Sequence, residues 1–344
     1  MIRLTVGDNA LAVAPHLGTL RELRFGEVSP LHVAPWVDDA TILADESLLP
    51  VERELAGDFF CAPFGGNDLD RGPSHGWSAN SAWEEVARGA NWVTLELARR
   101  IQGARLRKTL RLSGEAPVLH QTHEISGGEG GLTVAHHPML RLAGGGRVFF
   151  SEKRCAVTPD QPLEPTGVLS YPARGEDLRA FPGRDGEIDL TRLPIGEGHE
   201  DFVSLIEAPG ARFGWTAVLR EAEQDIVVML KDPRVLPLTM LWFSNCGREY
   251  APWNGRHLGV LGIEDGCAAG ADGHRAALGD NAIAREGVPT HLPLGGTHRV
   301  EHLIAWFPRP EGWQEIYDVR LEAGRLTVVE QSGETQFIPC PDPF

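Results

Sequence analysis

The stretch Ile2-Arg3-Leu4-Thr5-Val6 alternates apolar and polar residues and is followed by the turn sequence Gly7-Asp8-Asn9. Alternation is the pattern of a strand with one buried face, because successive side chains of a strand point to opposite sides. Similar short runs, each ending at Gly, Asn, Asp or Pro, recur along the chain. Further strands are predicted at 11–13, 19–25, 92–97, 104–112, 132–135, 147–150, 202–207, 213–219, 225–230, 238–243, 258–263, 300–307 and 326–330.

The composition supports a fold of many short strands. The 344 residues include 40 Gly and 25 Pro, which are spread through the chain and therefore serve many turns. Short helices are expected only at 80–88 and 273–285, and the segment 158–200, rich in Pro and Gly, is expected to run over the surface. We predict an all-β fold, a large antiparallel β-sandwich, in which residues 1–344 form a single domain.

The net charge excludes two classes of partner. The chain carries 48 acidic and 32 basic residues, a net charge of −16, which repels both nucleic acid and anionic membrane surfaces. No run of 18 apolar residues occurs, so no membrane span is predicted. The five cysteines are odd in number and form no CxxC pair, which favours a reducing compartment. Because the N-terminus also lacks the pattern of a signal peptide, we expect a cytoplasmic protein.

The motifs of common cofactor and metal sites are missing from the sequence. It contains no GxxxxGK[ST], no strand-to-helix GxGxxG, no GxSxG and no HExxH. The pair His136-His137 lies in a predicted strand, where neighbouring side chains point to opposite faces, so only one of the two can face a site. We therefore predict no cofactor and no metal.

Three segments carry residues suited to chemistry. The first runs from Pro63-Phe64-Gly65 to His75-Gly76 and reads as a loop that brings backbone and an imidazole close to a ligand. The second places His137 in an apolar strand, and the third places Glu264 at the end of one, where partial burial raises a carboxyl pKa toward that of a general base. Taken singly, each has a structural explanation: a surface histidine, a hydrogen-bonded core histidine and a solvated strand end.

In their order along the chain, these segments resemble the aldose 1-epimerase and galactose mutarotase-like superfamily, including its hexose-phosphate 1-epimerase members. The resemblance covers nearly the whole chain. It rests on the opening hairpin with its turn Pro15-His16-Leu17-Gly18, and on Pro63-Phe64-Gly65, His75-Gly76, Trp83, His137 to Leu142, Ile263-Glu264 and Leu292 to Thr297.

The resemblance implies an enzyme that interconverts the anomers of a sugar by opening its ring. Glu264 would be the general base that takes the proton of the anomeric hydroxyl, and His137 the general acid that protonates the ring oxygen. His75 would hydrogen-bond the sugar beside the reacting centre. The expected partner is a small carbohydrate, and the candidate substrate contacts are Arg71, Asn67, Trp77, Asp232 and Trp242.

The sequence also departs from the family pattern. The family's H-G-F-A-R block here ends Trp77-Ser78-Ala79, so its arginine is lost, and Arg71 is a candidate replacement. The segment Gly57-Asp58-Phe59 stands where R-G-G is frequent, and Asp265 replaces a proline. The missing basic residues favour a sugar without phosphate. Two alternatives stay open: a non-catalytic carbohydrate-binding or regulatory protein, and a lyase or metal-assisted isomerase on the same scaffold.

Overall fold

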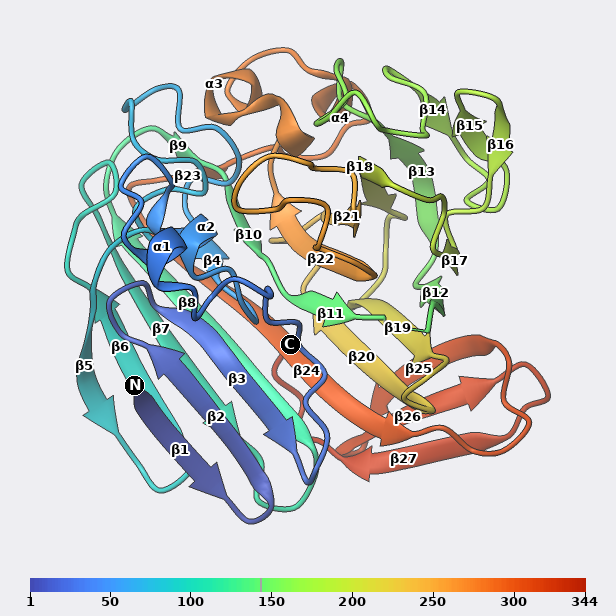
Figure 1. Cartoon of the computed structure of the whole chain (residues 1–344). Helices are drawn as coiled ribbons and strands as arrows, with labels where there is room; N and C mark the ends of the chain where they lie inside the picture. Colours follow the sequence, from blue (N-terminus) through green and yellow to red (C-terminus); the bar gives the residue numbers. More distant parts are fainter. Residues whose placement is uncertain (143) are drawn as a thin grey trace.

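The computed structural model describes residues 1–142 and 144–344, and within them two large antiparallel sheets dominate the fold (Figure 1). The nine-stranded sheet has the order β17 (Arg192–Leu193), β12 (Gly146–Phe150), β19 (Gly214–Arg220), β20 (Asp225–Lys231), β24 (Thr297–Pro308), β8 (Val118–Gly127), β7 (Ala104–Leu112), β6 (Trp92–Leu97), β5 (Trp83–Arg88). The eight-stranded sheet has the order β14 (Arg174–Gly175), β13 (Lys153–Val157), β18 (His199–Glu207), β21 (Leu238–Asn245), β22 (Val260–Cys267), β10 (Val134–His136), β4 (Phe60–Cys61), and β11 (Met139–Arg141) also pairs with β22.

Smaller elements complete the fold. One three-stranded sheet is formed by β1 (Ile2–Val6), β2 (Asn9–Ala14) and β3 (Thr19–Phe25), and another by β25 (Ile316–Glu322), β26 (Arg325–Glu330) and β27 (Thr335–Pro339). Two short pairs are β15 (Phe181–Gly183) with β16 (Gly186–Ile188), and β23 (Leu292–Pro293) with β9 (Gly131–Leu132). The helices are α1 (Ala40–Leu43), α2 (Pro50–Arg53), α3 (His274–Ala277), α4 (Ala282–Arg285) and the 3₁₀ turn η1 (Gly270–Asp272). None of the helices in the described ranges has the length and apolar character needed to span a bilayer.

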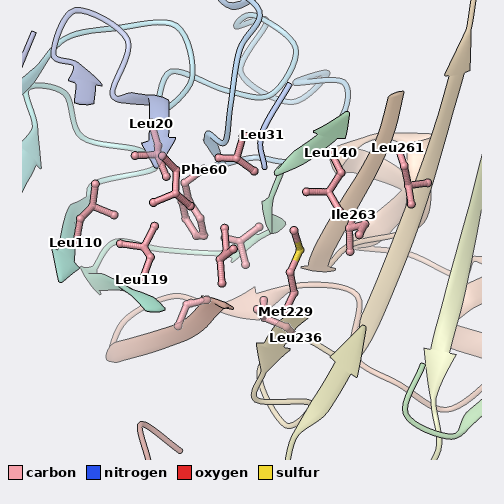
Figure 2. Close-up of a cluster of buried hydrophobic side chains, with 14 of the residues drawn as sticks. Leu20, Leu31, Phe60, Leu110, Leu119, Leu140, Met229, Leu236, Leu261 and Ile263 are labelled. Atoms are coloured by element: carbon pink, nitrogen blue, oxygen red, sulfur yellow. The ribbon is translucent and has the colours of Figure 1, made fainter. Parts of the chain in front are cut away.

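Three buried apolar clusters hold these layers together. The first lies between the two large sheets, where Leu110 and Leu119 of the nine-stranded sheet pack in one cluster with Leu261 and Ile263 of the eight-stranded sheet (Figure 2). The second covers the outer face of the eight-stranded sheet, and the third joins the outer face of the nine-stranded sheet to β25–β27. The eight-stranded sheet is therefore buried on both faces, which explains why β18, β21 and β22 are buried along almost their whole length.

The all-β prediction is confirmed, and the predicted strands differ from the observed ones mainly at their ends. The helix predicted at 80–88 is wrong, because residues 83–88 form β5, an edge strand that pairs with β6 and leaves five of its six residues exposed. The helix predicted at 273–285 is two short helices, α3 and α4. The strands β4, β8, β11, β13, β23, β25 and β27 were not predicted, and segment 158–200 contains the short strands β14–β17. Strand β8 pairs on both sides, with β7 and β24, but its polar residues interrupt the apolar pattern by which strands were predicted.

Side-chain alternation in the eight-stranded sheet decides which residues face its outer side. Leu241 on β21 and Ile263 on β22 are paired and point into the core between the sheets. Their neighbours Trp242 and Glu264 point the other way. Asp265, next along β22, is again on the inner side, where it pairs with Lys231.

We predict that Gly57→Ala destabilises the protein more than Gly26→Ala. Both glycines have a left-handed backbone, with φ of 60° and 59°, which costs an alanine roughly 1–2 kcal/mol. At Gly57 the new β-carbon would also lie 1.8 Å from the carbonyl oxygen of Leu20, whereas at Gly26 it meets no atom within 4 Å. Urea denaturation of the two variants measures the difference, and equal losses of unfolding free energy would contradict the close approach at Gly57.

Candidate active site

A cavity of about 260 Å³ opens on the outer face of the eight-stranded sheet. Its wall brings together the three residues predicted to be catalytic, His75, His137 and Glu264, with the rings of Trp242 and Trp253. Larger hollows lie elsewhere on the described surface, but their linings contain none of these three residues. The smaller cavity is therefore the candidate site.

His137 and Glu264 form a direct pair. Glu264 lies within β22, and His137 follows the last residue of β10, the strand that pairs with β22. Nε2 of His137 is 3.1 Å from Oε1 of Glu264, and both side chains are almost completely buried. Nδ1 of His137 and Oε2 of Glu264 have no hydrogen-bond partner in the described part of the chain. Each side chain of the pair therefore keeps one buried polar atom with unused hydrogen-bonding capacity.

The surroundings of the pair decide where its proton lies. Burial raises the pKa of Glu264 well above its usual value. Burial, together with the neighbouring His75, lowers the pKa of His137 to about 3. Both shifts favour a neutral carboxyl group beside a neutral imidazole.

His75 reaches the cavity from the loop between β4 and β5. Its backbone is left-handed, with φ of 61°, and its N–H donates to the carbonyl of Gly65 at 2.8 Å. The ring centroid lies 5.2 Å from that of His137, and Nδ1 is 3.4 Å from Sγ of Cys61. Burial and the nearby Arg248 lower the pKa of His75 to about 4, so at neutral pH this imidazole is uncharged and has one donor and one acceptor nitrogen.

The indole of Trp242 is held in place by a buried carboxyl group. Nε1 of Trp242 donates to Oε2 of Glu200 at 2.9 Å, and the hydroxyl of Ser244 donates to Oε1 of Glu200 at 2.6 Å. The ring lies edge-on to His137 and to Trp253, with centroids 5.6 and 5.9 Å away. The cavity thus has a fixed aromatic wall beside its acid–base pair.

Arg248 also lines the cavity, although the sequence analysis did not select it. Its guanidinium lies 4.4 Å from the ring centroid of Trp253, and its Nε is 3.1 Å from Oε1 of Glu164. The same Glu164 oxygen accepts the Tyr250 hydroxyl at 2.6 Å. The only sequence feature that could have indicated Arg248 as a site residue is its position just after an apolar strand, directly following Asn245-Cys246-Gly247.

The structure places four of the predicted substrate contacts away from the cavity wall. Arg71 is exposed on its loop, and Trp77 packs beneath an arginine guanidinium 3.8 Å from its ring centroid. Asn67 is a buried residue of the same loop, and its side-chain amide has no hydrogen-bond partner in the described residues. Asp232 forms an ion pair with Arg234 at 2.7 Å, in the turn after β20. Of the five candidate contacts, the structure brings only Trp242 to the wall.

Residues 1–142 and 144–344 contain no group of three or more His, Cys, Asp or Glu side chains that could hold a metal ion. His136 and His137 indeed lie on opposite sides of the sheet. His136 stacks on His302 in the core at a centroid distance of 4.2 Å, whereas His137 faces the cavity.

The fold and the cavity together define a large β-sandwich with the pair His137–Glu264 in a pocket on one of its sheets. No protein-family model and no curated protein sequence matches the chain. Solved structures do match. The aldose epimerase homologue from C. elegans has 15% identity, a TM-score of 0.59, and coverage of 90% of this chain and 99% of its own. The galactose mutarotase related enzyme from Lactobacillus acidophilus has 12% identity, a TM-score of 0.56, and coverage of 90% and 98%.

A third match is the galactose 1-epimerase from Lactobacillus acidophilus NCFM, with 9% identity, a TM-score of 0.53, and coverage of 89% of this chain and 93% of its own. Identities this low show the fold alone. The chain has the galactose mutarotase-like fold, as the resemblance in the sequence predicted.

We predict that Glu264→Gln stabilises the protein at neutral and higher pH. Because folding raises the pKa of Glu264, the unfolded chain gives up this proton more readily than the folded one. The free energy of unfolding therefore falls as the pH rises from the usual carboxyl pKa toward the raised one. A glutamine has no such proton, so the variant should be more stable than the wild type at pH 8 and equally stable near pH 4.

Denaturant titrations of both proteins from pH 4 to pH 8 measure this difference. Glu129→Gln, at an exposed turn position, is the matched control and should show no such trend. A constant difference between Glu264→Gln and wild type over this range would contradict the raised pKa.

Proposed function

We propose that this protein is an aldose 1-epimerase, an isomerase that interconverts the anomers of a neutral sugar by acid–base ring opening. The contact of 3.1 Å between His137 and Glu264 in the wall of a cavity carries the proposal. One general acid beside one general base is what breaking a hemiacetal C–O bond needs. The shared fold with structures named as aldose epimerases supports the same activity.

In the proposed reaction, Glu264 and His137 act on the two oxygens bonded to C1. Glu264 as carboxylate takes the proton of the anomeric hydroxyl, and the electrons of that O–H bond form the C1 carbonyl. The bond from C1 to the ring oxygen breaks, and protonated His137 gives its proton to that oxygen. Rotation about C1–C2 presents the other face of the aldehyde, and the reverse steps close the ring to the other anomer.

Both positions of the shared proton are used in this cycle. Ring opening starts from a carboxylate beside an imidazolium and ends with a carboxylic acid beside a neutral imidazole. This second state is the one that burial favours in the structure, and it is also the state that ring closure requires. Nε2 of His137 and Oε1 of Glu264 are 3.1 Å apart, close enough for a proton to pass between them. A sugar that accepts from His137 and donates to Glu264 therefore favours the protonation state from which ring opening starts.

The remaining wall suits a single uncharged sugar ring. The indoles of Trp242 and Trp253 offer apolar surface to the C–H face of a pyranose, and His75 offers a donor and an acceptor to its hydroxyls. The charge of Arg248 is balanced by Glu164. A cavity of about 260 Å³ lies below the range of roughly 300–1,000 Å³ for drug-sized ligands, which favours one ring over a longer glycan.

The cysteines support a cytoplasmic location for this enzyme. All five, Cys61, Cys155, Cys246, Cys267 and Cys340, are free thiols, and four of them are buried. Free thiols persist in a reducing compartment.

We predict that Glu264→Gln and His137→Asn each slow anomer interconversion by about a hundredfold or more, because each removes one partner of the proton transfers. NMR exchange or polarimetry on a panel of neutral aldoses measures the rate, and circular dichroism verifies the fold. His120→Asn, on the nine-stranded sheet and outside the cavity, is the matched control and should keep the wild-type rate.

Binding of a sugar without acceleration by the wild type would refute the epimerase proposal and leave a carbohydrate-binding protein. A wild-type enzyme whose rate survives both substitutions would refute the roles given to Glu264 and His137.

We predict that Arg248→Leu raises KM about tenfold and changes kcat little. In the proposed complex, Arg248, which lines the cavity, hydrogen-bonds the sugar before and after ring opening alike. Its loss then weakens binding in all states, and a hydrogen bond to a charged group contributes about 1.5–3 kcal/mol. Steady-state kinetics measure both constants. Arg234→Leu, at an exposed ion pair outside the cavity, is the control. An unchanged KM would show that Arg248 does not bind the sugar.

A further inference from the structure

The backbone at His137 lies at a break in the sheet. β10 ends at His136 and β11 begins at Met139, because Pro138 between them has no N–H to donate to a neighbouring strand. The N–H of His137 is buried at this break and needs an acceptor. It donates to Oδ1 of Asp58 at 2.9 Å, and the N–H of Met139 donates to the carbonyl of Gly57 at 2.9 Å. Gly57 and Asp58 thus provide the hydrogen-bond acceptors that a neighbouring strand would otherwise provide.

Asp58 is itself held rigidly. Its N–H donates to the carbonyl of Leu20 at 3.1 Å, and its carbonyl accepts the N–H of Leu20 at 2.8 Å. Its second carboxylate oxygen accepts Nε2 of Gln121 at 2.7 Å, and 2% of the residue is exposed. The preceding Gly57 can approach Leu20 this closely only because it has no side chain. The carboxylate of Asp58 therefore has a defined position.

The next residue, Phe59, contacts the imidazole of the same histidine. Its ring stacks on that of His137 with centroids 4.3 Å apart and an angle of 21° between the planes. Asp58 and Phe59 together hold the main chain and the ring of His137. These two residues belong to the segment Gly57-Asp58-Phe59, which stands where R-G-G is frequent in the family that the sequence resembles and to which the sequence pattern assigned no function.

The charge of Asp58 is the second part of its effect. Burial opposes ionisation. His136, whose Nδ1 lies 3.5 Å from the carboxylate, the hydrogen bond from Gln121 and the nearby His302 outweigh it, so the pKa of Asp58 lies at about 2. Lys108 is the other basic group near this carboxylate. At neutral pH Asp58 is therefore a buried anion.

This anion acts on His137 against its other neighbours. Asp58 favours the protonated imidazole, whereas burial and His75 oppose it. Oε1 of Glu264 lies 3.1 Å from Nε2 of His137, and His257 is a further titratable group near the ring. Protonated His137 is the state that starts ring opening, and Asp58 makes it more accessible.

We infer that Asp58 is a positioning residue, which fixes the imidazole of His137 for proton transfer to the ring oxygen and stabilises its charged state. This inference rests on the proposed epimerase function. Asp58 faces the core between the sheets and is absent from the cavity wall, so it acts through His137 and not on the sugar.

Two substitutions separate the two effects of Asp58. Asp58→Asn keeps an oxygen for the His137 N–H and removes the charge. In this variant kcat should fall about tenfold, and the alkaline limb of the kcat profile should move about one unit to lower pH, because the pair loses its proton more readily. Asp58→Ala removes the acceptor as well, and kcat should fall about a hundredfold because the imidazole is misplaced. KM should change little in either variant.

Asp225→Asn is the matched control. Asp225 is an equally buried carboxylate, paired with Arg220 in the nine-stranded sheet, and its loss should leave the kcat profile unchanged. If Asp58→Asn folds and shows the wild-type kcat and the wild-type pH profile, Asp58 is not a positioning residue. If Asp58→Ala fails to fold, the kcat and pH profile of Asp58→Asn alone decide whether Asp58 is a positioning residue.

Amide hydrogen exchange of His137, followed by NMR, tests the inference without any activity. We expect slow exchange in the wild type and in Asp58→Asn, and fast exchange in Asp58→Ala. A wild type that turns over no sugar would refute the proposed function, whereas unchanged slow exchange in Asp58→Ala would refute the hydrogen bond to Asp58. The two failures are therefore distinguishable.

Discussion

The pairing of β21 with β22 is the constraint on which the rest of the site depends. In its register Leu241 lies opposite Ile263, and both enter the core between the two large sheets. Because side chains alternate along a strand, Trp242 and Glu264 must then face the outer side. A slip of one residue would turn Glu264 into the core and Asp265 outward. The buried leucines and isoleucines of this core therefore decide where the acid–base pair lies.

The same alternation divides the buried charges of the protein into two groups with different roles. On the inner side of β22, Asp265 is paired with Lys231 and His302, so its charge is compensated. On the outer side, the neutral His137 is the one ion-pair partner of Glu264 among residues 1–142 and 144–344. A buried carboxyl group without a compensating cation costs stability. Where such a group lines a cavity, it therefore indicates a functional site. Asp58 connects the two sides, since it accepts from residues of the core and from the main chain of His137.

Much of the fold and part of the site could be predicted from local sequence. The strands with clear alternation were found, and the polar strand β8 was not, because its pairing with two neighbours does not depend on apolar side chains. Strand β5 was taken for a helix because its exposed edge carries no period of two. Trp242 was selected and reaches the cavity, whereas Arg71 and Asp232 were selected for their places near loops and strand ends and lie elsewhere.

The sequence by itself determined the all-β architecture and the identity of His75, His137 and Glu264 as candidates, since alternation and motif order are properties of the chain. Only the tertiary structure decided that Arg248 and Trp253 complete the cavity and that Asp58 holds His137. The physical reason is distance along the chain. Asp58 and His137 are 79 residues apart, and their contact depends on a strand break and on the packing of two loops, which no local period encodes.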